Sequence, residues 1–216
     1  MTDPQSKTGA RTPVTDSIDI KDPRLRSLMH RLSKHPANGA EPKPREGHTQ
    51  AAVALVVRAS DDLELLLIER AKSVRDPWSG HVALPGGRRD PGDAILEETA
   101  IRETSEETGV ELATRGLQLG RLTEVLPSSE RLPPITVVPY VFAVPPDVDA
   151  RVNSREVQSV LWVSIETLLD PRSGRTITID LPEGPRKFPS YHVRGHTIWG
   201  LTFRILTEFL TMAETP

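Results

Sequence analysis

The sequence contains no cysteine among its 216 residues. Disulfide bonds, thiolate catalysis and cysteine-bound zinc are therefore excluded for this chain. Aromatic residues make up only 4% of the sequence, and the formal net charge is −3 at pH 7. A nucleic-acid surface needs a strongly basic face, and single strands need aromatic platforms for their bases. We therefore expect no nucleic-acid partner.

Long apolar runs are also missing. The clean apolar stretch at 51–57 is far shorter than the roughly 20 residues that span a bilayer. The opening segment MTDPQSKTGA has no apolar core of the kind that a secretory signal contains. We therefore expect a soluble, cytoplasmic protein with no membrane partner. Hydrophobic residues make up 37% of the chain, enough for one buried core.

The composition changes near residue 47. Residues 1–47 hold six prolines and few large apolar groups, so we expect a largely flexible extension. Within it, Asp22 can cap a helix that begins at Pro23. Helical apolar spacing follows at Leu25, Leu28, Met29 and Leu32. This pattern predicts a short amphipathic helix at about 22–35 that docks on the main domain, with partner binding as the alternative.

Residues 48–216 form the expected main domain. Apolar and β-branched runs predict strands at 51–58 and 63–70, joined by a hairpin turn at Asp61–Asp62. Further strands are predicted at 117–126, 135–144, 158–163 and 176–181, and helices near 93–109, 164–169 and 198–212. These elements indicate an α+β fold class, with a mixed β-sheet and helices packed on it.

One predicted helix carries an unusual cluster of charges, in the segment Arg102-Glu103-Thr104-Ser105-Glu106-Glu107-Thr108-Gly109. Glu103, Glu106 and Glu107 stand at i, i+3 and i+4, so their side chains share one helix face. Like charges repel there, and the helix dipole disfavours negative charge at this end. A divalent cation would reverse the sign of each of these effects. We interpret the three carboxylates as ligands for Mg²⁺ or Mn²⁺; a solvated acidic face is the alternative.

Neighbouring residues fit the same interpretation. Arg102 can hold a carboxylate through paired N–H groups and so fix the geometry of a metal ligand. The upstream pair Gly86-Gly87 would let the backbone approach a metal ion or phosphates closely. The chain has neither the G-x4-G-K-[ST] phosphate loop nor a nucleophile elbow. The acidic helix is therefore the best candidate for the reactive centre.

The segment from Gly86 to Val110 resembles the Nudix box, G-x5-E-x7-R-E-U-x-E-E-x-G-U, in which U is apolar. The matching residues are Gly87, Arg102, Glu103, Glu106, Glu107, Gly109 and Val110. The segment departs from the box by one extra residue between Gly87 and Arg102, and by Thr104 in place of U. The first glutamate is absent, and Asp93 or Ala94 takes its place depending on the direction of counting.

This resemblance implies a Nudix-type α/β/α sandwich, with helices on both faces of the mixed sheet. It also implies Mg²⁺-dependent hydrolysis of a pyrophosphate bond in a nucleoside diphosphate linked to another group. Glu103, Glu106 and Glu107 would then be metal ligands, and one of them would serve as general base, with Arg102 beside them. The sequence does not separate the base from the ligands.

An upstream pattern resembles the subfamily that hydrolyses coenzyme A, L-L-x-x-R-[SA]-x3-R-x3-G-x3-F-P-G-G. The matching residues are Leu66, Leu67, Arg70, Ala71, Arg75, Gly80, Pro85, Gly86 and Gly87. Leu84 replaces the Phe, and four residues rather than three separate Arg75 from Gly80. Residues 188–191 and 198–202 also look like the C-terminal region of that subfamily. Coenzyme A or a derivative is then the expected substrate, giving 3′,5′-ADP and 4′-phosphopantetheine.

The candidate substrate-binding residues are Arg70, Arg75, Gly86, Gly87 and His81. Glu156 is a further candidate carboxylate outside the box, although an exposed loop charge is the simpler explanation. We expect surface roles for His192 and His196 rather than a metal pair. Two alternatives stay open: a hydrolase for ADP-ribose or dinucleoside polyphosphates, and an inactive Nudix module that binds a nucleotide or a partner. A homodimer also stays open.

Overall fold

The computed structural model describes residues 20–72, 79–127, 134–181 and 184–214. Within these ranges, the strands of the larger sheet are β1 (Thr49–Ala59), β2 (Leu63–Arg70), β3 (Val82–Ala83), β4 (Gly86–Arg88), β5 (Leu117–Arg121), β6 (Ile135–Val144) and β7 (Val157–Ser164). A smaller sheet contains β8 (Gly174–Leu181), β9 (Gly184–Val193) and β10 (His196–Trp199). The helices are α1 (Pro23–Ser33), α2 (Leu96–Thr108), α3 (Leu112–Arg115), α4 (Ile165–Leu169) and α5 (Gly200–Ala213), with a 3-10 turn η1 (Pro171–Ser173).

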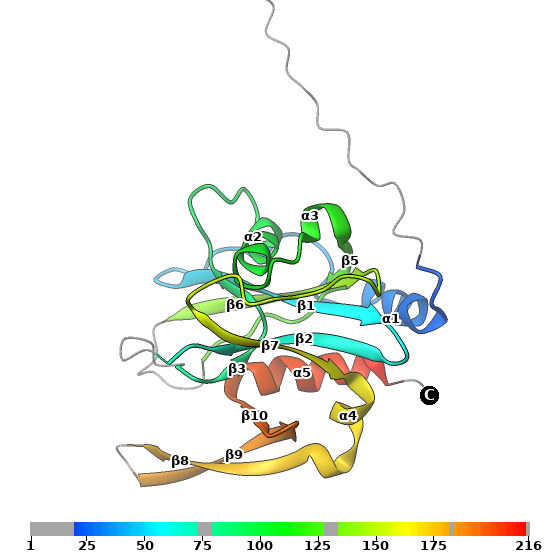
Figure 1. Ribbon diagram of the computed structural model, residues 1–216. Coiled ribbons are helices and arrows are strands. Elements are labelled where there is room, and N and C mark those ends of the chain that lie inside the picture. The colour runs from blue at the N-terminus through cyan, green and yellow to red at the C-terminus, as the bar shows by residue number, and fades with distance from the viewer. Residues whose placement is uncertain (1–19, 73–78, 128–133, 182–183, 215–216) are drawn as a thin grey trace, which may run out of the picture.

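The larger sheet is mixed. Its strands follow the order β3-β2-β1-β6-β5, with β7 beside β2 and β4 beside β1. β1 and β6 run parallel along ten residue pairs, whereas β1 pairs antiparallel with β2 and with β4. The α2 and α3 helices lie over one face of the sheet, and α5 lies along the other (Figure 1). The structure therefore confirms the expected α+β fold with helices on both faces of a mixed sheet.

Alternation along β1 builds a separate hydrophobic core on each face. Leu55 and Val57 point into the core that contains α1 and α5, whereas Ala54 and Val56 point into the core beneath α2. Successive side chains of a strand point to opposite faces, so an unbroken apolar run suits a strand covered on both sides. No helix in the described part of the chain combines the length and apolarity that crossing a membrane requires.

Most of the predicted elements occur, with shifted ends. The strand predicted at 135–144 coincides with β6, and α4 begins after Ser164, whose hydroxyl accepts the Thr167 N–H and so caps the helix. The helix predicted from 93 begins only at Leu96, because Asp93 is engaged in a turn with Asp90. The strand predicted at 117–126 stops at Arg121.

The smaller sheet was not predicted as a separate unit. The expected helix at 198–212 begins at Gly200, because residues 196–199 pair with β9 as a strand. The short elements β3, β4 and α3 were also missed. Figure 1 shows α5 between the larger sheet and the β8-β9-β10 sheet, so the C-terminal region adds a further layer.

The described part of the extension, residues 20–47, contains one helix. Helix α1 lies where the apolar spacing predicts it, and Leu25, Leu28 and Leu32 are buried in the core shared with α5. Its cap is the predicted one, since the Asp22 carboxylate accepts the N–H of Arg24 at 2.8 Å. Docking on the main domain is therefore what the structure shows for this helix.

After α1, residues 37–41 run along the edge of the larger sheet. The backbone N–H of Arg121, in edge strand β5, donates to Oδ1 of Asn38 at 2.8 Å, and its guanidinium donates to the carbonyls of Ala37 and Ala40. Farther on, a carboxylate oxygen of Glu41 accepts the N–H of Leu96 at 2.8 Å, at the start of α2. This edge segment (37–41) thus joins the layer of α1 to the layer of α2.

Candidate active site

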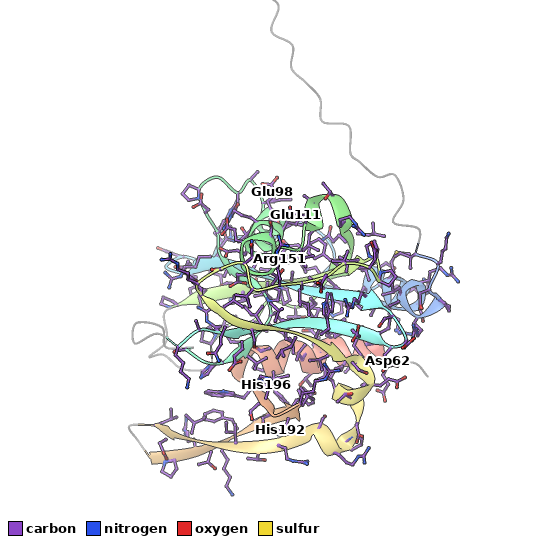
Figure 2. The ribbon with its side chains drawn as sticks, in the orientation of Figure 1. Asp62, Glu98, Glu111, Arg151, His192 and His196 are labelled. Carbon is purple, nitrogen blue, oxygen red and sulfur yellow. The ribbon has the colours of Figure 1, made fainter. Side chains whose placement is uncertain are left out.

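The C-terminal end of α2 is held by the loop that precedes β7. The backbone N–H of Arg151 donates to the carbonyl of Thr108 at 2.9 Å, and that of Asn153 donates to Glu107 at 3.1 Å. The Asn153 side chain also donates to the carbonyl of Ser105 at 3.0 Å. A helix leaves its last carbonyls without helical partners. These bonds satisfy three of the last four carbonyls and fix the acidic end of α2 beside this loop, where Figure 2 labels Arg151.

Glu107 is the most buried acidic side chain of the helix, with 4% of its surface exposed. Its Oε2 accepts the backbone N–H of Gly86 at 2.9 Å. Burial raises the pKa of the Glu107 carboxyl to about 8, and repulsion from Glu103 adds to the rise, whereas the charge of Arg70 opposes it. The structure thus holds a carboxylate where its ionised form is poorly solvated.

Glu103 lies directly against the second glycine of the pair. A Cβ atom at position 87 would stand 2.3 Å from Oε1 of Glu103, so any larger residue there would have to displace the Glu103 carboxylate. Burial also raises the pKa of the Glu103 carboxyl, and the neighbouring Arg102 charge opposes this rise. Gly86 has a φ of 152°, and a Cβ there would stand 2.3 Å from the carbonyl oxygen of Ala52. The glycine pair therefore lets β4 pass close to both carboxylates.

Arg102 is held by a residue that the sequence interpretation left unassigned. Its Nε and Nη2 donate to the two oxygens of Asp93 at 3.1 and 3.0 Å, and its Nη1 donates to Glu103 at 3.0 Å. Asp93 also accepts the hydroxyl of Thr99 at 2.8 Å. The hydrogen bonds from Arg102 hold the pKa of the Asp93 carboxyl at about 2. The sequence contained one signal for this role of Asp93. Counted from Gly87, Asp93 stands at the position of the glutamate that is missing from the box.

The three glutamates are not gathered as closely as their spacing predicts. Glu103 and Glu107 both face β4, whereas the Glu106 side chain is 58% exposed and lies 3.3 Å from Nη1 of Arg102. Across the described ranges, no three acidic or histidine side chains stand close enough together to hold a metal ion as they are placed. Two of the three carboxylates thus face β4, and the third lies at the rim next to Arg102.

The donor set nevertheless fits a hard divalent cation. Glu103 and Glu107 offer only oxygen atoms, and both carboxylates resist ionisation because they are partly removed from water and repel one another. A cation between them would offset both effects. Oxygen ligands of this kind suit Mg²⁺ or Mn²⁺.

Two more of the candidate residues, Arg70 and Glu156, lie near these carboxylates, where β2 ends. The backbone N–H of Arg70 donates to the carbonyl of His81 at 3.0 Å, and the next N–H, of Ala71, donates to the carbonyl of Glu156 at 2.7 Å. The negative charge of Glu156 contributes to the raised pKa of both Glu103 and Glu107. Glu156 therefore lies near the carboxylates although its side chain is exposed.

The remaining candidates are Arg75 and three histidines. Arg75 falls in 73–78, outside the described residues. The His81 ring contacts the indole of Trp199, with centroids 4.9 Å apart. His192 is an exposed residue whose Nδ1 lies 3.3 Å from the hydroxyl of Thr197. Among the described side chains, no group of three metal-binding residues includes His192 or His196.

Comparison with known proteins identifies the family. The model of the NUDIX domain matches residues 48–179. A Nudix hydrolase of Photorhabdus laumondii, named NudL and itself uncharacterised, is 31% identical over 170 residues, 78% of this chain and 87% of its own length. The corresponding protein of Yersinia enterocolitica is 32% identical over 159 residues, 72% of this chain and 77% of its own length.

Two further relatives have different coverage. An uncharacterised protein of Schizosaccharomyces pombe is 36% identical over 57% of this chain, which spans only 38% of that protein's length. Among solved structures, a MutT/nudix family protein from Enterococcus faecalis is similar with a TM-score of 0.52 and 19% identity, over 78% of this chain and 63% of that one. The fold, the matched domain and these relatives agree, and the chain belongs to the Nudix hydrolase family, whose members are pyrophosphohydrolases that act on nucleotides.

Proposed function

We propose that this protein hydrolyses the pyrophosphate bond of coenzyme A or a derivative, with Mg²⁺ or Mn²⁺ bound at Glu103 and Glu107 and Glu106 completing the site. The observation that carries the proposal is the pair of partly desolvated carboxylates of Glu103 and Glu107 against Gly86 and Gly87. Burial of these two carboxylates does not stabilise the folded protein. A cation bound to them and to a substrate diphosphate would stabilise their ionised forms.

Each residue has a distinct role in this mechanism. When bound, the cation supplies charge neutralisation for the diphosphate and an attacking water of lowered pKa. Arg102, fixed by Asp93, orients Glu103 and keeps Glu106 near the site. Gly87 leaves space for the Glu103 carboxylate beside β4, and the backbone N–H of Gly86 holds the Glu107 carboxylate.

Two charged residues complete the proposal: Arg70 at the end of β2 and Glu156 just before β7. The positive charge of Arg70 would bind a phosphate oxygen and is already felt at Glu107. The exposed carboxylate of Glu156 would accept the proton of the attacking water; its charge acts on both ligand carboxylates, and it is open to solvent. His81 would contact the substrate from the neighbouring chain segment.

The choice of coenzyme A rests on the pattern upstream of the box. Arg70 and Ala71 belong to that pattern, and the structure has them at the end of β2 beside the carboxylates. Arg75 would add a second phosphate contact. ADP-ribose and dinucleoside polyphosphates share the diphosphate but lack phosphopantetheine, so they are the competing substrates.

The direct test is incubation of the purified protein with coenzyme A and Mg²⁺, followed by chromatography for 3′,5′-ADP. Glu103→Gln should lower kcat about 100-fold or more, because it removes a charged ligand from the cation. Glu166→Gln, an equal change of charge in the first turn of α4, serves as the control and should leave turnover intact.

This test can reject the coenzyme A assignment and the hydrolytic activity independently of each other. Rapid cleavage of ADP-ribose or a dinucleoside polyphosphate, without release of 3′,5′-ADP from coenzyme A, would reject the substrate and keep the chemistry. No cleavage of any of these compounds with Mg²⁺ or Mn²⁺ would favour a module that only binds nucleotides. Equal turnover by Glu103→Gln and the wild type would reject the site.

A further inference from the structure

One face of the β8-β9-β10 sheet carries polar side chains in register. Arg175 of β8 and Trp199 of β10 both pair with Ser190 of β9, and Thr197 of β10 pairs with His192. Directly paired residues of antiparallel strands point to the same face, and residues 190 and 192 share a face because they are two apart on one strand. These five side chains therefore lie together.

The opposite face of this sheet is already occupied. Val193 and Ile198 are buried in the core that contains α5, and Tyr191 packs against that core. The face that carries Ser190 therefore points away from this core. Figure 2 labels His192 in this sheet, below α5.

A cavity of about 290 Å³ opens on the polar face. It is lined by Arg175, Thr176, Ile177, Ser190, His192 and Thr197. Four of these residues, Arg175, Ser190, His192 and Thr197, carry hydrogen-bonding side chains on this face, and none of the six is acidic. Arginine and hydroxyl donors without a carboxylate nearby favour an anion, above all the oxygens of a phosphate group.

Ser190 gives independent evidence that this cavity receives a ligand. Ser190 is 1% exposed, and its hydroxyl has no hydrogen-bond partner among the described residues. Buried hydroxyls are normally bonded, and one without a partner destabilises a protein. A hydroxyl retained under these conditions is explained by a partner that arrives from outside the chain.

Aromatic rings border the same face. Trp199 is the cross-strand neighbour of Ser190, and Phe188 lies two residues before Ser190 on β9. Their ring centroids are 5.6 Å apart, and both side chains are partly exposed. A planar base stacks well on rings of this kind.

From the donors and the adjoining rings, we infer that this face binds a nucleoside phosphate, with its phosphate at Arg175, Ser190, His192 and Thr197 and its base against Trp199 and Phe188. The nucleotide comes from one of two sources. It is either the nucleoside end of the hydrolysed substrate, which would reach this face along the contact between Trp199 and His81, or a separate nucleotide. Binding is measured without turnover, so this site is tested apart from the hydrolysis proposed above.

The experiment is calorimetric titration of the full chain with AMP in EDTA, with inorganic phosphate and adenosine as partial probes. AMP should bind more tightly than either part. Arg175→Met should weaken AMP binding about 10- to 100-fold, because it removes charge-assisted bonds to the phosphate. Lys187→Met removes the same charge from the opposite face of the same hairpin and should leave AMP binding unchanged.

Ser190→Ala separates a ligand contact from a mere packing defect. The variant should raise the Tm of the ligand-free protein, because an unpartnered buried hydroxyl is removed. It should also weaken AMP binding about 3- to 10-fold. Wild-type affinity in both Ser190→Ala and Arg175→Met, or no AMP binding in EDTA, would overturn the inference.

A kinetic arm distinguishes the two sources of the nucleotide. If the substrate's own nucleoside occupies this face, Arg175→Met should raise the KM for the hydrolysed substrate about tenfold with kcat unchanged. If a separate nucleotide occupies it, KM should stay at the wild-type value while AMP affinity falls. Either result supports the site, whereas unchanged KM together with unchanged AMP affinity contradicts it.

Discussion

The backbone N–H of Gly86 donates to Oε2 of Glu107 across 2.9 Å, joining β4 to α2 at the candidate site. This single bond does not offset the burial of the Glu107 carboxylate, whose pKa rises to about 8. In the absence of a cation, the protein therefore carries a carboxylate that is unfavourable to ionise near neutral pH. The buried Glu107 carboxylate therefore lowers the stability of the folded protein at the proposed site of hydrolysis.

Glu107→Gln should stabilise the protein in EDTA while abolishing turnover. The folded-state pKa lies above the ordinary value of 4.5, so the folded protein binds this proton more tightly than the unfolded chain does. Wild-type stability should then fall as pH rises from about 4.5 to 8, and the variant should lack this part of the fall. At pH 8 in EDTA we expect its Tm to exceed the wild-type Tm by about 5 °C.

Adding Mg²⁺ provides the matching control. A ligand that binds only the folded state raises its stability by mass action. The Tm of the wild type should therefore rise with Mg²⁺ concentration, and the Tm of Glu107→Gln should rise less. If Glu107→Gln is less stable than the wild type in EDTA at pH 8, the buried Glu107 carboxylate does not destabilise the folded protein.

Asp93→Asn should destabilise the protein at neutral pH. Asp93 has a folded-state pKa of about 2, below its ordinary 3.8, so its ionised form stabilises the fold above pH 3.8. This stabilisation is lost as pH falls from 3.8 towards 2. We expect a loss of about 2 kcal/mol in the free energy of unfolding at pH 7, measured with urea. The difference from the wild type should shrink at pH 2.5; a constant difference would contradict this linkage.

Gly87→Ala should lower kcat about 100-fold with coenzyme A, because misplacing a group by about 1 Å at the reacting centre has effects of this size. Its Cβ would stand 2.3 Å from Glu103 Oε1 and must displace that carboxylate. Gly39→Ala is the control, since nothing lies within 4 Å of a Cβ there. Circular dichroism should show a native fold for both variants, and equal kcat values would count against Glu103 as a ligand.

Asn153→Ala should loosen the acidic end of α2. It removes the side-chain bond to the carbonyl of Ser105 at 3.0 Å but leaves the backbone bond to Glu107. We expect a loss of about 1 kcal/mol in the free energy of unfolding and a modest fall in kcat. Val152→Ala, at an exposed neighbouring position, should match the wild type in both measurements.

Local patterns predicted much of this structure. The unbroken apolar run of β1 reflects a strand covered on both faces, and the left-handed Gly109, with φ 69°, ends α2 where predicted. The spacing of Glu103 and Glu107 placed both on the side of α2 that faces β4. These features depend on residues that are close in sequence, so their physical causes are visible there.

Long-range partners could not be predicted in this way. Asn153 reaches Ser105 across 48 positions, and Glu41 reaches Leu96 across 55. Neither residue lies in a pattern that indicates its partner. The same reason explains the missed sheet, since β10 is recognisable as a strand only through its pairing with β9.

The edge segment (37–41) has a consequence for association between molecules. β5 ends the larger sheet, and an open strand at such a position offers its backbone to another chain. Here the N–H of Arg121 is taken by Asn38, and carbonyls of the same segment occupy the Arg121 guanidinium. Asn38→Ala would leave the N–H of Arg121 on this edge without its side-chain acceptor while α1 stays in place, and self-association through β5 should become visible in light scattering.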